Sequence, residues 1–248
     1  DIARDYLGYK VDESGRIVNA DEVYGLFGAE KDKDSLTIVG CNFIKEIEGG
    51  YELTEGATEL VERFKHNEEW EKVLGSQLLK YSIRIRTIAY AMLNGGYLYF
   101  EKGYMENFAK AYITLNDKKF YVFSSKPDEM NINSLMKENQ SKILGDFWRK
   151  ELDIGDGEEI EFRGVNKDYP SLGSMSTYLK IPMLLFDYLG WIVESEDRRY
   201  ILDKHKIKED AGIDVYESLV NEADVDDIEI LHKLIKEYSD ARGFFPIG

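Results

Sequence analysis

The sequence is poor in cysteine. Cys41 is the only one among 248 residues, so the chain has neither an internal disulfide nor a zinc site built from several cysteines. Cys41 ends an apolar stretch, and we expect its thiol to be buried. Because the chain has no disulfide to make, the sequence predicts a reducing, cytoplasmic compartment.

Long apolar runs are missing as well. The longest, such as residues 181–186, reach about a third of the roughly 18–20 residues that span a bilayer. The start of the sequence shows no signal-peptide pattern. We therefore expect no membrane-spanning helix and no membrane partner.

Positive charge is scarce overall. There are 32 Lys and Arg against 48 Asp and Glu, a net charge of −16, whereas nucleic-acid binders usually carry a basic surface. The acidity lies at the two ends, because residues 1–69 have a net charge of −9, residues 209–248 of −8, and the middle of +1. Local attraction to phosphate in the middle is therefore compatible with the total, since distant charges are screened.

Signatures of known catalytic and cofactor sites are absent from the sequence. The three histidines, His66, His205 and His232, are far apart, which supports neither a zinc site nor a Ser-His triad. There is no P-loop and no dinucleotide fingerprint. We expect no cofactor and no metal and assign no catalytic residue, while a metal-dependent nuclease with an unrecognised site stays an alternative.

A short pattern occurs twice. Phe43-Ile44, an acidic residue, the polar turn Glu48-Gly49-Gly50 and Tyr51-Glu52-Leu53 form the first copy. Trp191-Ile192, an acidic residue, a polar turn and Tyr200-Ile201-Leu202 form the second. Each copy follows an apolar helical stretch, so each predicts a helix that runs into a β-hairpin.

Residues 20–66 resemble the winged-helix domains of many prokaryotic proteins, most closely in the stretch from Phe43 to Leu60. Residues 171–208 resemble a second winged helix. The resemblance implies an α+β fold with two winged-helix-like units around a helical middle that contains a β-hairpin. The expected divisions are 1–66, a middle region 67–170, the second unit 171–208 and an acidic helical tail 209–248.

The remaining patterns predict the other elements. We expect a hairpin at 9–18, helices at 20–27 and 36–41, and a helix that starts at Thr54-Glu55-Gly56. Two helices are expected within 68–94, a strand at 97–100 and a hairpin of 111–115 with 120–123. A helix at 132–152, a strand at 159–163 and a tail helix around 228–235 follow. In the second unit, Ser176 or Thr177 is expected to cap a helix after a separate one at 171–175, with Pro182 in or near its first turn.

The second copy carries the candidate DNA-binding residues. Arg198 and Arg199 lie at or near its wing tip, where Arg can contact phosphate, and Lys204 follows. Ser174, Ser176, Thr177 and Lys180 lie near the start of the preceding helix, whose N-terminus attracts phosphate. The alternative is a solvated basic turn with ordinary helix caps.

Arg84 and Arg86 form another basic spot, in which they alternate with Ile83 and Ile85. They either contact nucleic acid or pair internally with the acidic first unit. The 17 Tyr and 12 Phe are candidates for base-stacking platforms, although most of them fall at the periodicities of a core.

We expect a DNA-binding protein of winged-helix type with double-stranded DNA as its partner. It would be a prokaryotic transcription regulator or the DNA-recognition component of a restriction or defence system. The alternatives are an acidic protein-interaction or adaptor module that docks on a protein partner or a second copy of itself, and the nuclease named above.

Overall fold

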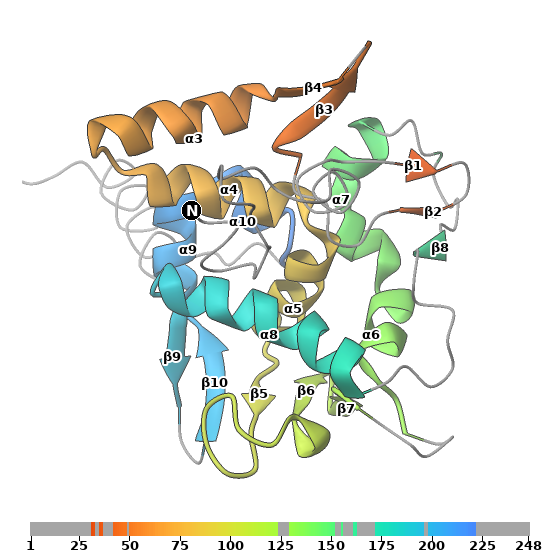
Figure 1. The fold of residues 1–248 in the computed structure, drawn as a ribbon. Coiled ribbons are helices and arrows are strands. Elements are labelled where there is room, and N and C mark those ends of the chain that lie inside the picture. The colour runs from red at the N-terminus through yellow and green to blue at the C-terminus, as the bar shows by residue number, and fades with distance from the viewer. Residues whose placement is uncertain are drawn as a thin grey trace, which may run out of the picture.

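The computed structural model describes residues 31–32, 35–36, 42–48, 50–123, 129–151, 155, 161–162, 172–195 and 198–221 (Figure 1). Four predictions lie outside these residues. They are the hairpin at 9–18, the helix at 20–27, the burial of Cys41 and the tail helix around 228–235.

A five-stranded antiparallel sheet, in the order β7-β6-β5-β10-β9, forms one end of the molecule (Figure 1). Its strands are β5 (Leu98–Tyr99), β6 (Tyr112–Leu115), β7 (Lys118–Tyr121), β9 (Ile192–Glu194) and β10 (Arg199–Leu202). Both hairpins of this sheet, β6–β7 and β9–β10, were predicted from the sequence. The mixed α+β class is confirmed.

Alternate residues of the sheet face opposite sides. Leu98, Ile113, Phe120 and Leu202 are buried, on the side where α5 (Ile83–Leu93) packs against β6 and β10. Tyr99, Tyr112 and Tyr121 lie on the opposite face and are half-buried. The core therefore fills one side of the sheet and leaves the other side partly open.

Helices surround α5 and complete the core. α4 (Trp70–Tyr81) and α5 share Ser82, which ends the first helix and caps the second by accepting from the Ile85 backbone N–H at 3.4 Å. α9 (Lys204–Ala211), capped by Asp203, packs along α4, and α10 (Ile213–Glu217) follows. Both helices in 68–94 were predicted, whereas the helix at Lys204 was not.

The first hairpin and its helix agree with the prediction. β3 (Ile44–Ile47) pairs with β4 (Gly50–Leu53), and α3 (Glu55–His66) begins after Thr54. The Thr54 hydroxyl accepts from the Ala57 N–H at 3.4 Å and donates to the Asn42 carbonyl at 2.7 Å, so it caps the helix and ties it to the hairpin.

The predicted helix at 36–41 is wrong at its first residue. Leu36 lies in β2 (Ser35–Leu36), between β1 (Lys31–Asp32) and β8 (Glu161–Phe162), in a separate three-stranded sheet. Pairing with β8, more than a hundred residues away in the chain, decides the conformation here. Local propensity cannot anticipate such a contact.

The predicted helix at 132–152 is divided. α6 (Ile132–Glu138) ends at Asn139, and α7 (Gln140–Glu151) is interrupted at Gly145. Gly145 has φ 64° and ψ 170°, a conformation that is essentially restricted to glycine.

The predicted helix start at Ser176 or Thr177 is also wrong. α8 (Leu172–Tyr188) runs through both residues without a break and contains Pro182 in its interior. Proline costs a helix interior roughly 3 kcal/mol. Leu179, Met183 and Phe186, on both sides of the proline, are fully buried, and this burial holds the helix together.

The five-stranded sheet joins two of the predicted divisions. β10, from the range 171–208, pairs with β5, from the range 67–170. A single cluster of buried apolar residues extends from Phe43 to Leu219. The boundaries expected from the sequence stay predictions.

Candidate nucleic-acid interface

Arg84 and Arg86 lie in the interior. Their exposed fractions are 8% and 1%, because α5 is covered by α4, α7, α8 and the sheet. Neither guanidinium is presented to a phosphate backbone, so we leave both residues out of the interface. The expected pairing with acids of the first unit stays a prediction.

The Arg86 guanidinium joins α5 to three other segments through hydrogen bonds. Nε donates to the Ile143 carbonyl and Nη1 donates to the Leu79 carbonyl at 2.5 Å. Nη2 donates to the Ser218 carbonyl at 3.4 Å and to the Ser218 hydroxyl at 3.3 Å. Burial lowers the pKa of Arg86 to about 9, so the side chain is charged at neutral pH. These partners are carbonyls and a hydroxyl, whereas the sequence suggests acids of the first unit.

Arg198 and Arg199 are exposed and lie where the β9–β10 hairpin turns (Figure 1). Arg198 has a left-handed backbone conformation, φ 62°, and its Nη1 donates to the carbonyl of Glu101 in the loop after β5. The guanidinium of Arg199 lies over the ring of Tyr97 at 4.7 Å. Both arginines therefore connect the hairpin to the neighbouring strand while they remain at the surface.

The other predicted residues are not gathered around this turn. Ser174, Ser176 and Thr177 lie in the first turns of α8, a helix about 25 Å long at 1.5 Å per residue, and its far end precedes the hairpin. Lys180 is exposed on the same helix, and Lys204 is exposed at the start of α9. The structure thus brings together Arg198 and Arg199 and leaves the remaining candidates as separate positions.

A row of side chains crosses four strands on the open face of the sheet. Arg199 pairs with Tyr99, Tyr99 with Tyr112, and Tyr112 with Tyr121. All three tyrosines are half-buried, so part of each ring reaches the surface. We call Arg199, Tyr99, Tyr112 and Tyr121, together with Tyr97 beside them, the tyrosine face.

The rings of the tyrosine face touch one another. Tyr99 and Tyr112 are stacked with centroids 5.0 Å apart, and Tyr121 meets Tyr112 edge-on at 5.7 Å. The Lys119 ammonium lies 4.6 Å from the Tyr112 ring centre. Burial, with a smaller contribution from Tyr97, raises the pKa of Tyr112 to about 12, so this phenol is uncharged at neutral pH. Lys119 and Arg199 place cations over the Tyr112 and Tyr97 rings.

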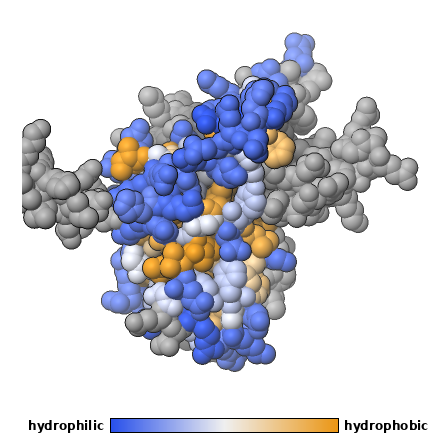
Figure 2. All heavy atoms as spheres, turned by 90° about the vertical axis from the view of Figure 1, so that its left-hand side faces the viewer, coloured by the Kyte–Doolittle hydropathy of each residue, from blue (hydrophilic) through white to orange (hydrophobic). Residues whose placement is uncertain are grey.

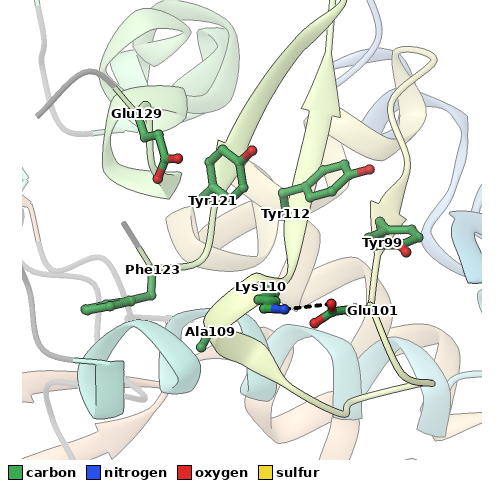
Figure 3. Close-up of a pocket in the computed structure, with 8 residues that line it drawn as sticks. All are labelled: Tyr99, Glu101, Ala109, Lys110, Tyr112, Tyr121, Phe123 and Glu129. Atoms are coloured by element: carbon green, nitrogen blue, oxygen red, sulfur yellow. Dashed lines mark hydrogen bonds and ion pairs between the residues drawn. The ribbon is translucent and has the colours of Figure 1, made fainter. Parts of the chain in front are cut away.

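A cavity of about 500 Å³ opens on this face (Figure 3). Its walls combine aromatic rings with two carboxylates and one ammonium. The residues are Tyr99, Glu101, Ala109, Lys110, Tyr112, Tyr121, Phe123 and Glu129. Glu101 is held from both sides, by Lys110 Nζ at 2.7 Å and by Asn107 Nδ2 at 2.7 Å.

Sequence reasoning did not identify this face. The alternation in Tyr97-Leu98-Tyr99-Phe100 and in Tyr112-Ile113 was the available signal, because period-two alternation predicts one open side. Reading these segments as strands was correct, but nothing in the spacing indicates that β10 pairs with β5 and brings Arg199 beside Tyr99.

Among the residues that the structure describes, no group of three or more His, Cys, Asp or Glu side chains could hold a metal ion. No helix within this described part has the length and apolar character that crossing a bilayer requires.

No protein-family model, curated protein or solved structure matches the chain.

Proposed function

We propose that this protein binds nucleic acid, and that the turn of the β9–β10 hairpin and the tyrosine face form the contact surface. The observation that carries the proposal is the row Arg199–Tyr99–Tyr112–Tyr121 across four strands. Partly exposed aromatic rings offer stacking surfaces to bases, and neighbouring cations attract the backbone.

This surface is much less acidic than the chain as a whole. Segments 97–123 and 192–202 together with Glu129, which build it, contain six basic and seven acidic residues. The chain as a whole has a net charge of −16. Because charges beyond roughly 8–10 Å are screened at physiological salt, the exposed Arg198 and Arg199 attract phosphate here more than the net charge of the chain repels it.

The winged-helix interpretation belongs to the same proposal. α8 leads into the β9–β10 hairpin, and β10 lies between β9 and β5. In this interpretation the hairpin is the wing, α8 is the helix before it, and β5 is a third strand beside it. In this interpretation α8, with Lys180, approaches duplex DNA and Arg198 and Arg199 hold its backbone. A transcription regulator and the recognition component of a restriction or defence system are the two settings that the resemblance suggests.

The test is a titration of labelled duplex and single-stranded oligonucleotides, followed by fluorescence anisotropy at about 50 mM and about 200 mM salt. We expect binding at the lower concentration and marked weakening at the higher one. Arg198→Ala/Arg199→Ala should weaken binding about tenfold or more. Arg63→Ala/Lys65→Ala is the matched control, because it removes the same charge from exposed positions on α3, at the opposite end of the molecule (Figure 1).

Two results would contradict the proposal. One is the absence of binding to either oligonucleotide at about 50 mM salt, where phosphate contacts are strongest. The other is equal binding by the wild type, the hairpin variant and the control variant, which would place the contact surface elsewhere.

A second candidate function, docking on a protein partner, is favoured by an aromatic cluster on α3, α4 and α8. Phe64 lies 5.4 Å from Trp70, and Trp70 lies 5.7 Å from Tyr188, between ring centres. Phe64 and Tyr188 are 58% and 37% exposed. Figure 2 shows apolar residues reaching the surface among hydrophilic ones on the side where α3, α4 and α9 lie. If this surface binds a protein or a second copy, Phe64→Ser should abolish the complex in sedimentation and leave nucleic-acid binding unchanged.

A further inference from the structure

The cavity on the tyrosine face is open and is lined largely by aromatic rings. Figure 3 shows Tyr121 and Tyr112 side by side on neighbouring strands, with Phe123 and Glu129 on one side and Tyr99 on the other. Its volume of about 500 Å³ falls within the roughly 300–1,000 Å³ that is usual for ligand sites.

We propose that this cavity binds an unpaired base of a nucleic-acid strand. The inference rests on the proposed nucleic-acid binding and names its substrate class, which is single-stranded nucleic acid or the unpaired end of a duplex. A base inside a duplex hides its faces in the stack, whereas an unpaired base can stack on an aromatic side chain.

The polar groups of the cavity suit the edge of a base. Carboxylate oxygens accept hydrogen bonds from the exocyclic amino groups of bases, and Glu129 lines the cavity beside Tyr121 (Figure 3). The charge of Glu101 is already compensated by Lys110 at 2.7 Å. The cavity thus combines aromatic rings for stacking with the Glu101–Lys110 ion pair and the Glu129 carboxylate.

The cavity and the hairpin turn form one continuous surface. Arg198 donates to the backbone carbonyl of Glu101, and the side chain of Glu101 lines the cavity. Arg199 stands in the same lateral row as Tyr99 and Tyr112. A strand whose phosphates contact the hairpin arginines can therefore place its next bases along the tyrosine face.

An organic cation is the competing occupant, because aromatic rings with carboxylates also attract quaternary ammonium groups. Arg198 and Arg199, which are exposed at the hairpin turn beside the cavity, favour the polyanion. Lys119 and Arg199, which lie over the rings of Tyr112 and Tyr97, repel a further cation and attract a phosphate.

The experiment uses the full chain and three DNA probes that carry 2-aminopurine: a single strand, a blunt duplex, and a duplex with a short unpaired overhang. The probes report stacking by a loss of fluorescence and binding by anisotropy. We expect tighter binding and stronger quenching for the single strand and the overhang than for the blunt duplex. Tyr121→Ala should weaken single-strand binding about fivefold or more, and Tyr121→Phe, which keeps the ring, should bind as the wild type does.

Phe64→Ala, which removes an exposed ring on α3, is the matched control and should change neither signal. Each variant is checked by thermal unfolding. If Tyr121→Ala does not fold, the comparison of the three probes on the wild type still decides the question.

The outcomes separate the two proposals. If no probe binds at low salt, the proposed function fails and this inference fails with it. If all three probes bind equally without quenching, nucleic-acid binding stands and the base site is overturned. It is also overturned if tetramethylammonium displaces a bound single strand at concentrations where sodium at equal ionic strength does not.

Discussion

The arginines at positions 86 and 198–199 have different roles because they are buried to different degrees. Arg86 is 1% exposed and donates to the carbonyls of Leu79, Ile143 and Ser218. Arg198 and Arg199 are exposed and contact the neighbouring strand from the surface. The degree of burial therefore decides whether an arginine side chain stabilises the fold or remains available to a ligand.

Replacing Arg86 by leucine should destabilise the protein by about 3 kcal/mol or more, because two buried carbonyls and one partly buried carbonyl lose this donor. The measurement is the free energy of unfolding from urea titration. Arg63→Leu, on the exposed face of α3, should change it by less than about 0.5 kcal/mol. Equal effects of the two substitutions would contradict a structural role for Arg86.

The Tyr112 phenol should make stability fall at high pH. Burial raises its pKa from 10.0 to about 12 in the folded state, so the folded protein keeps the proton that the unfolded chain loses above pH 10. The stabilisation is complete below the unfolded pKa and is lost as pH rises through the folded one. Unfolding free energies measured between pH 9 and 12 should fall more steeply for the wild type than for Tyr112→Phe, and parallel curves would refute this.

At the scale of elements, the sequence predicted units that are stabilised locally. The β3–β4 hairpin, the start of α3 at Thr54 and the β6–β7 hairpin were predicted correctly, because their turns and caps lie within a few residues. The predictions failed for Leu36, for the helix start at Ser176 or Thr177 and for the helix through Gly145. Leu36 pairs with a distant strand, and the burial of α8 keeps that helix continuous through Ser176 and Thr177. Gly145 has a backbone conformation that only glycine adopts readily, and it interrupts α7.

Gly145 within α7 offers a test of this account. An alanine there would require a backbone conformation that only glycine adopts readily, and its Cβ would lie 2.8 Å from Nη2 of Arg86. Gly145→Ala should therefore cost roughly 1–3 kcal/mol of unfolding free energy. The control is Gly103→Ala, whose Cβ would meet only Glu106 atoms at 3.7 Å and beyond and should cost less than about 1 kcal/mol. If Gly145→Ala has a negligible effect, the backbone at this position does not require glycine, which would contradict this explanation of the break in α7.

At the scale of the whole molecule, the sheet brings residues distant in the chain to one surface. Tyr99 and Tyr112 come from one segment and Arg199 from another a hundred residues later. The sequence could indicate that Arg198 and Arg199 lie in a hairpin turn and that aromatic residues alternate in strands. It could not indicate that the hairpin joins the other strands, because strand order depends on pairing between remote segments.

Photo-crosslinking tests the central claim most directly, because it locates the contact on the protein. A single-stranded oligonucleotide that carries 5-iodouracil is irradiated with the full chain, and the modified peptides are identified by mass spectrometry. We predict crosslinks within residues 97–123 and 198–202, which lie in or beside β5, β6, β7 and β10, and their loss in the Arg198→Ala/Arg199→Ala variant. Crosslinks confined to other segments, such as α3 or α9, would contradict the assignment of the tyrosine face as the nucleic-acid interface.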